Sequence, residues 1–194
     1  MFAMIAVIGA MVTYEIINAS KPSEQAPPLV VPDLIDAETL PVVEKAGDFV
    51  VTEQDTSGFP EGQWTGNQQL FVATKAAGQS LSLGIPARDP GSYHLTGYFT
   101  KSYDYGTLQI FVNDEKTGAP VDLWSYSIES TGPVPLGVVR LTGEDDVIRI
   151  EVEGKNEKAS APYYQFGLDG FVFRAEDGGP ATGSEPANTS DDSP

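Results

Sequence analysis

The chain has 194 residues, no cysteine, and 28 acidic against 11 basic side chains, which gives a formal net charge of −17. Without cysteine it has no disulfide, thiolate nucleophile, iron–sulfur cluster or cysteine zinc site. Its negative charge repels phosphate backbones, so no nucleic acid is expected as a partner. We interpret the acidity as an aid to solubility in an exposed or saline compartment, ahead of a site for a cationic ligand.

Residues 1–17 are apolar up to Val12 and then include Thr13, Tyr14 and Glu15. Such a run lies between the roughly 20 residues of a membrane span and the roughly 7–15 of a signal-peptide core. Because no basic residue precedes it, we expect residues 1–19 to form one short apolar helix retained as a membrane anchor. A cleaved signal peptide is the alternative. The acidic body favours the outer side of a bacterial cytoplasmic membrane, in the periplasm, or secretion if the segment is cleaved.

The sequence divides the rest of the chain into three parts. Residues 20–32 are rich in proline and polar side chains, which is typical of an extended tether. Residues 33–176 carry the apolar patterning of one globular domain. Residues 177–194 offer no large apolar side chain to offset the entropy of ordering, so we expect an acidic, disordered tail.

Polar and apolar side chains alternate along much of the body. Between Ile148 and Glu153 every second residue is aliphatic and every intervening one is charged, which places the two kinds on opposite faces of a strand. Half-buried strands separated by Gly, Pro, Asp and Asn turns predict an all-β, two-sheet antiparallel sandwich. The expected strands are 37–43, 48–53, 69–75, 79–85, 92–100, 106–113, 121–128, 136–141, 146–153 and 164–174.

A series of short motifs points to a particular kind of sandwich. In chain order they are Gly91-Ser92-Tyr93, Phe99 to Gly106, Gln109 to Asp114, Val121 to Trp124, Leu136-Gly137, Gly154 to Asn156, and Phe166 to Asp169. The series resembles a jelly-roll domain of bacterial secreted proteins, which also lies beside the catalytic domain of a glycoside hydrolase family acting on fructose and arabinose sugars. The resemblance implies a jelly roll over about 33–174 and, more weakly, carbohydrate binding.

Two further segments resemble family 6 and family 35 carbohydrate-binding modules: Asp36-Ala37-Glu38 near the start and Leu168-Asp169 in the last strand. In those modules the corresponding acids help to hold a structural calcium ion. The resemblance therefore implies Glu38 and Asp169 as calcium ligands, and calcium does prefer oxygen donors. In the alternative interpretation, Asp169 caps a turn and Glu38 is solvated.

Aromatic residues in the expected loops are the candidate binding site. Flat rings stack on sugar C–H groups while amides and carboxylates bind the hydroxyls. Loops 54–66, 101–106 and 155–165 could meet at one end of the sandwich. We expect the carbohydrate- or partner-binding residues to be Trp64, Tyr103, Asp104, Asn156, Tyr163 and Tyr164. Core packing or a protein-binding hot spot are the alternatives, and packing is favoured for Trp124.

No motif indicates catalysis. The only histidine, His94, alternates with Thr96 on the expected outer side of its strand, and the chain has no nucleophile elbow, phosphate-binding loop or H-E-x-x-H. We therefore expect no enzyme activity. The predicted function is that of a non-catalytic, carbohydrate-binding-like sandwich, tethered to or exported across the membrane. The alternative is a membrane-anchored accessory subunit that docks onto a larger membrane or envelope complex.

Overall fold

The computed structural model describes residues 27–60 and 62–176. The expected anchor helix over 1–19, most of the tether and the tail 177–194 lie outside the described residues. Within the described ranges, no helix is long and apolar enough to cross a membrane.

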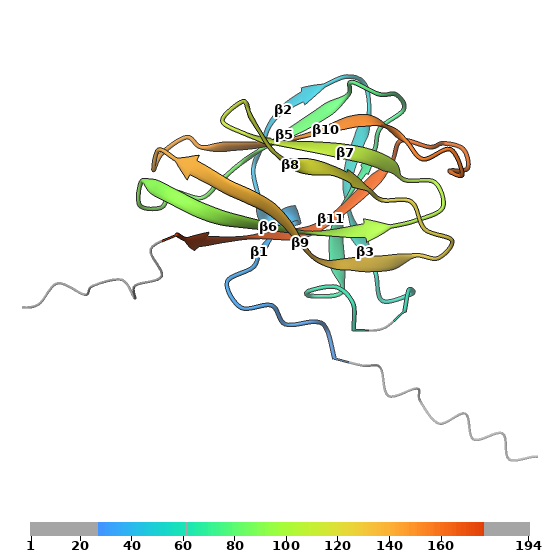
Figure 1. Ribbon diagram of the computed structural model, residues 1–194. Coiled ribbons are helices and arrows are strands. Elements are labelled where there is room, and N and C mark those ends of the chain that lie inside the picture. The colour runs from blue at the N-terminus through green and yellow to red at the C-terminus, as the bar shows by residue number, and fades with distance from the viewer. Residues whose placement is uncertain (1–26, 61, 177–194) are drawn as a thin grey trace, which may run out of the picture.

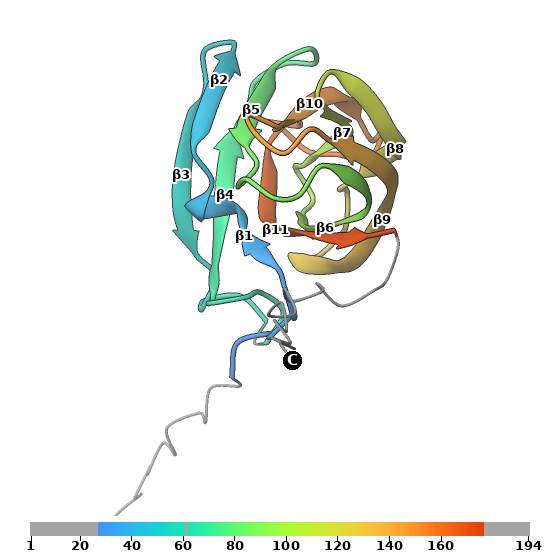
Figure 2. The ribbon, with the colours of Figure 1, turned by 90° about the vertical axis from the view of Figure 1, so that its left-hand side faces the viewer.

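The described chain is almost entirely β-structure, arranged as two layers face to face (Figures 1 and 2). The elements in chain order are β1 (Ile35–Asp36), the 3-10 helix η1 (Ala37–Thr39), β2 (Val42–Ala46), β3 (Val50–Asp55), β4 (Gln68–Ala73), β5 (Ser80–Gly84), β6 (Gly91–Lys101), β7 (Gly106–Val112), β8 (Glu115–Asp122), β9 (Glu129–Leu141), β10 (Val147–Lys155) and β11 (Phe166–Ala175).

One sheet has the order β3-β4-β11-β6-β9, with β1 paired to β11, and the other has the order β2-β5-β10-β7-β8. Every pairing between these strands is antiparallel. The predicted two-sheet antiparallel sandwich is thereby confirmed.

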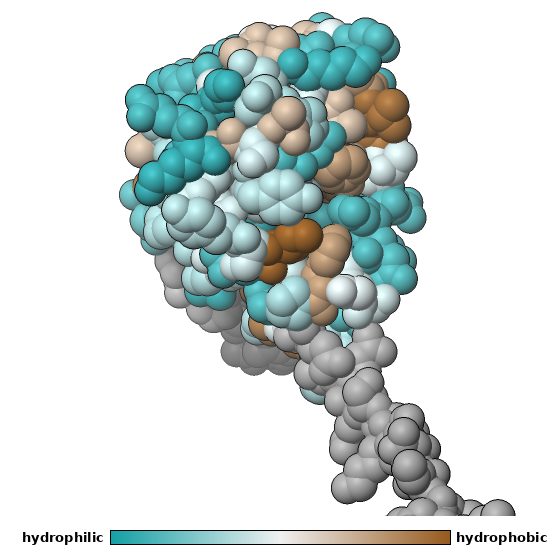
Figure 3. Space-filling model, turned by 90° about the vertical axis from the view of Figure 1, so that its right-hand side faces the viewer, coloured by the Kyte–Doolittle hydropathy of each residue, from teal (hydrophilic) through white to brown (hydrophobic). Residues whose placement is uncertain are grey.

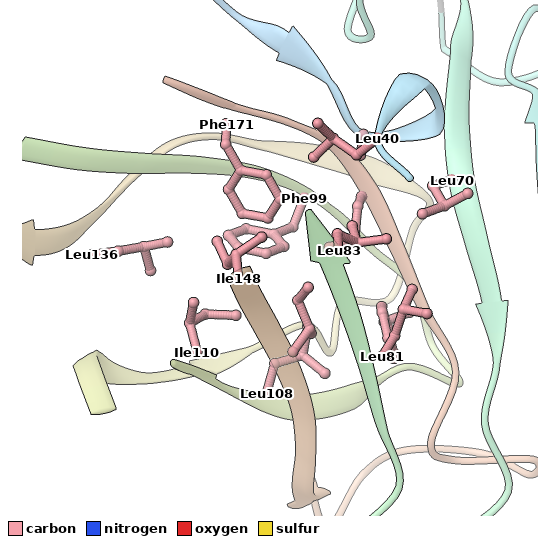
Figure 4. Packing of buried hydrophobic residues seen from close by; sticks show 14 of the residues in the cluster. Leu40, Leu70, Leu81, Leu83, Phe99, Leu108, Ile110, Leu136, Ile148 and Phe171 are labelled. Atoms are coloured by element: carbon pink, nitrogen blue, oxygen red, sulfur yellow. The ribbon is translucent and has the colours of Figure 1, made fainter. Parts of the chain in front are cut away.

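The space between the sheets is filled by the aliphatic side of each alternating strand (Figure 4). Ile148, Ile150 and Val152 of β10 are fully buried, while the charged residues between them face outward. Phe99 and Phe171 meet edge to face with ring centroids 6.2 Å apart. Full burial of a side chain of this size contributes about 1.5–3 kcal/mol, so this core stabilises the domain without disulfides.

Strand β11 is buried on both faces from Phe166 to Phe173. A register shift between Leu168 and Gly170 marks a β-bulge against β6, which lets the strand turn side chains on either side of it toward the core. On the outer side of the bulge the N-terminal segment packs so closely that a Cβ at position 170 would collide with the Ile35 carbonyl and the Leu34 side chain. Glycine is therefore required where β1 pairs with β11.

Two predicted strands are corrected. The strand expected over 37–43 begins only at Val42, because Ala37 to Thr39 form a 3-10 turn in which the Leu40 N–H donates to the Ala37 carbonyl over 3.2 Å.

The strand expected over 121–128 is β8 shifted toward the N-terminus. Asn113 and Asp114 both have positive φ, at 50° and 64°, as a two-residue hairpin turn requires. The return strand consequently starts at Glu115 and ends at Asp122. Proline at position 120 is tolerated because β8 is an edge strand. The segment with Trp124 is therefore a loop.

The contact at position 170 gives a testable expectation. Gly170→Ala should lower the free energy of unfolding by about 1–3 kcal/mol, because overpacking forces β1 away from β11. Gly154→Ala on β10 is the matched control, since a Cβ there meets no atom within 4 Å. Urea unfolding of both variants measures the difference. Equal stability of the two variants would show that β1 does not hold the bulge.

Candidate functional site

Three loops meet at one end of the sandwich. We define the loop end as residues 102–105 (β6 to β7), 123–128 (β8 to β9) and 156–165 (β10 to β11). Backbone hydrogen bonds join them: Ser102 N–H donates to the Leu123 carbonyl over 2.9 Å, and Ser160 N–H donates to the Tyr103 carbonyl over 2.8 Å. Figure 3 faces this end, whose surface is mainly hydrophilic to intermediate with small apolar areas. The loops are thus fixed to one another rather than independent.

Aromatic rings are the most prominent feature of the loop end. Tyr126 is 82% exposed and Tyr103 is 49% exposed. The half-buried Trp124 contacts Tyr126 edge to face, with centroids 4.5 Å apart and planes at 71°. Tyr163 and Tyr164 form a second edge-to-face pair at 6.1 Å. This set offers ring surfaces from all three loops.

Two lysine ammonium groups lie over these rings. Lys158 Nζ is 5.1 Å from the centroid of Trp124, and Lys155 Nζ is 3.7 Å from that of Tyr163. Such cation–π contacts are worth about 0.5–1 kcal/mol at exposed sites. The Lys158 contact holds the 156–165 loop near Trp124, and the Lys155 contact holds Tyr163 near the end of β10, while both lysines stay exposed.

Hydrogen-bonding groups surround the rings. Asn156 Nδ2 donates to Asp122 Oδ2 over 2.6 Å, and Ser102 Oγ donates to Asp104 Oδ1 over 2.6 Å. The indole N–H of Trp124 is buried and has no acceptor. A buried donor without a partner costs free energy and calls for a water or a ligand.

Trp64 does not belong to this surface. It was expected on an exposed platform, but it is only 1% exposed, so that prediction is wrong. Its indole N–H donates to Thr100 Oγ1 over 2.8 Å, and Thr100 in turn donates to Gln69 Oε1. Gln69 completes the chain by donating to Gln54 over 2.6 Å. Trp64 thus ties the loop between β3 and β4 onto the outer face of the six-stranded sheet.

The loop end contains most of the other predicted residues. Tyr103 and Asp104 lie on the 102–105 loop, and Asn156 and Tyr163 lie on the 156–165 loop, whereas Tyr164 is half-buried and packs partly against the core. Trp124 and Tyr126 also lie on the loop end but are not among the predicted site residues: packing was favoured for Trp124, and both fall within the expected strand 121–128. Asn113-Asp114 was the available signal, since a two-residue turn there moves the strand and puts position 124 in a loop.

A second polar cluster lies where β1 and η1 meet β11. Asp169 is fully buried, and its Oδ1 accepts from Thr65 N over 3.0 Å and from Thr65 Oγ1 over 2.8 Å. The same Thr65 hydroxyl also lies 2.7 Å from Asp36 Oδ1, although it has one hydrogen to donate. Asp169 Oδ2 and Glu38 Oε2 are buried without any partner.

Burial raises the pKa of both orphaned carboxyl groups. That of Asp169 rises to about 6, chiefly through burial, with a smaller contribution from the charge of Asp36. That of Glu38 is raised by burial and by the charges of Asp36 and Asp169. Two desolvated carboxylates fit a calcium ion in donor chemistry. Within 27–60 and 62–176, however, no three Asp, Glu or His side chains form a metal-ligand group, so backbone carbonyls or water would have to complete the coordination.

Known proteins match this chain through structure alone. Neither protein-family models nor curated protein sequences give a match. A segment of Paenibacillus xanthan lyase superposes with a TM-score of 0.61 at 22% identity, covering 79% of this chain and 14% of the lyase. The chain therefore spans a small part of that enzyme. This likeness shows the fold and confirms the predicted jelly-roll resemblance at that level.

Isolated modules give lower scores. A family 35 carbohydrate-binding module from Clostridium thermocellum has a TM-score of 0.43 at 14% identity, covering 73% of this chain and 96% of the module. One from Paenibacillus barcinonensis has a TM-score of 0.41 at 15% identity, covering 73% and 98%. Superpositions this loose carry no functional argument.

The buried position of Trp64 gives a stability prediction. Trp64→Ala should lower the free energy of unfolding by about 3–5 kcal/mol, as for a buried aromatic, and Trp64→Phe by about 1–2 kcal/mol through loss of the bond to Thr100. Trp124→Ala should lower the free energy of unfolding by only about 1 kcal/mol, because Trp124 is half-buried in a loop. Denaturant unfolding distinguishes them. If Trp64→Ala were as stable as the wild type, Trp64 would not anchor its loop.

Proposed function

We propose that the loop end binds a carbohydrate chain without acting on it chemically. The observation that carries the proposal is the grouping of aromatic rings from three separate loops, exposed at Tyr103 and Tyr126 and half-buried at Trp124 and Tyr163, bordered by amide, carboxylate and ammonium groups. Tyr126 and Tyr103 present accessible ring surface, on which pyranose C–H groups stack. Asp104, Asn156 and Lys158 lie beside the rings and supply donors and acceptors for hydroxyl groups.

The fold is compatible with carbohydrate binding but does not by itself indicate it. The xanthan lyase that shares the sandwich is named for its action on a polysaccharide, and a jelly roll hosts many functions. The proposed ligand must displace Lys158 from the face of Trp124 or use the opposite face.

We further propose that Glu38 and Asp169 hold a structural calcium ion. Its charge would offset the repulsion between these buried carboxylates and fix the N-terminal segment against β11. The support is the pair of orphaned oxygens and the raised pKa values of both groups.

The cellular location remains a proposal from the sequence. We propose that residues 1–19 and the proline-rich tether hold the module on the outer side of the cytoplasmic membrane, or direct its secretion. Its support is the apolar run up to Val12 together with the net charge of −17.

Affinity gel electrophoresis of the full chain tests carbohydrate binding. A panel of soluble neutral and acidic polysaccharides, xanthan included, is cast into native gels. We expect at least one to retard the wild type, and Trp124→Ala and Tyr126→Ala each to weaken that retardation by about tenfold, since a stacked ring contributes about 1 kcal/mol beyond its buried area. Val138→Ala is the control, because Val138 is 49% exposed on β9 and outside the loop end.

Two results would contradict the proposal. One is a lack of retardation throughout the panel, together with no signal on a glycan array. The other is retardation that both aromatic variants retain at wild-type strength, which would place any sugar site elsewhere.

Stability against pH tests the acidic cluster. In the presence of a chelator, protonated Asp169 stabilises the folded state fully below about pH 4, and this stabilisation is lost as the pH rises through about 6. The reason is that the folded state holds the proton more tightly than the unfolded state. The shift of two pKa units corresponds to about 3 kcal/mol. Asp169→Asn keeps the acceptor for Thr65 and should remove this pH dependence.

Calcium separates the metal proposal from the titration. At neutral pH, excess calcium should raise the Tm of the wild type, because a ligand bound only to the folded state stabilises it, and should leave Asp169→Asn unchanged. A wild-type Tm that is identical in calcium and in chelator excludes the proposed ion. A wild type and Asp169→Asn with the same pH profile would instead refute the raised pKa.

A further inference from the structure

A wide cavity lies away from the loop end. It has a volume of about 760 Å³ and is formed where the β5–β6 and β9–β10 connections meet the start of β2; we call it the distal groove. These connections face the viewer in Figure 2. Pro41, Val43, Ile85 and Pro86 make its apolar floor, and Glu144 and Asp145 are on its rim. A second cavity of about 410 Å³ continues it along the sheet face and shares Val43 and Asp145.

The floor is exposed apolar surface on an edge strand. All five residues of β2 are exposed, and Val43, at 58%, lies in the register shift between Val42 and Glu44. Pro41 and Val43 pack across Gly84, where a Cβ would lie 3.0 Å and 3.5 Å from their side chains. Strand β2 has β5 on one side only, so its other edge is open to an extended chain.

The charged residues that line the distal groove are all acidic, and Arg149 of the second cavity is paired with Asp114 and Glu151. No lysine or arginine lines the larger cavity, and neither Glu144 nor Asp145 takes part in an ion pair within the described residues. The neighbouring Asp146 is already satisfied by donors from Thr142, Gly143 and Asn113. Arg88 forms no ion pair with these carboxylates; its guanidinium carbon instead lies 4.8 Å from the centroid of the Phe173 ring. The rim therefore leaves two carboxylates free to bind cations.

We propose that the distal groove docks an extended, aliphatic and basic peptide segment of a partner protein. Aliphatic side chains would occupy the floor over Pro41 and Val43, and lysine or arginine side chains would reach Glu144 and Asp145. Carbohydrate fits poorly because no aromatic ring lines the groove. A second copy of this chain is disfavoured by repulsion, since each copy carries a net charge of −17.

The groove is independent of the proposed carbohydrate site. The two sites share no residue, so the domain could hold both ligands at once. Loss of one activity in a variant therefore says nothing against the other.

The experiment uses the full chain and a fluorescein-labelled peptide of alternating valine and lysine. Fluorescence anisotropy should detect binding that weakens with salt. Val43→Lys should weaken it by about fivefold, the size of one unfavourable charge contact. Val50→Lys is the matched control, since Val50 is also 58% exposed but lies on β3 outside the groove.

A second matched pair tests the acidic rim. Asp145→Asn should weaken binding by about twofold to threefold, because it removes one rim charge. Asp33→Asn should have no effect: Asp33 is exposed, and its φ of 62° is close to the 57° of Asp145, so both positions accept asparagine equally.

Four outcomes would overturn the proposal. The first is no binding of the valine–lysine peptide. The second is equal weakening by the control variants, which would indicate general attraction to an acidic protein. The third is equal affinity for a peptide with serine in place of valine, which would remove the apolar floor from recognition. The fourth is a homodimer in sedimentation that Val43→Lys dissociates, which would make a second copy the occupant.

Discussion

Burial of β11 on both faces is the constraint on which the rest of the molecule depends. Its inner face supplies Phe166, Leu168 and Phe171 to the core. Its outer face is buried as well, so other segments of the chain fold over this side of the sheet. The N-terminal segment and the loop between β3 and β4 do so. Glycine at position 170 leaves room for Leu34 and Ile35, and glycine at position 167 leaves room for the side chain of Gln69.

This shielding decides what several polar and aromatic residues do. Tryptophan is a residue type that often binds ligands, yet Trp64 covers the outer face of the six-stranded sheet, and its indole N–H donates to Thr100. Asp169 is enclosed by the same cover and keeps one oxygen without a partner. A carboxyl group in that position either retains its proton or requires a cation, which is why pH and calcium are the informative variables there.

The two ends of the sandwich differ because different connections form them. At the loop end, connections rich in tyrosine and tryptophan are joined by hydrogen bonds, so ring surface accumulates where loops meet. At the other end, short turns such as Thr142 to Asp146 close tightly around a buried carboxylate, and the space beside them is lined by proline and valine. The proposed carbohydrate and the proposed basic peptide would therefore bind at opposite ends of the sandwich.

The sequence by itself determined the fold class and most strands, because alternation at period two is a local property that each strand carries in full. It also placed Tyr103, Asp104, Asn156 and Tyr163 in loops at one end. Only the tertiary structure decided that Trp64 is buried and that Trp124 and Tyr126 are available. Exposure of an aromatic depends on which distant segment packs over it, and the shift of β8 depends on a turn geometry that pairing with β7 selects. Local pattern does not contain the burial of Trp64, since it arises from contacts between residues far apart in the chain, whereas Asn113-Asp114 is a local signal for the shift of β8.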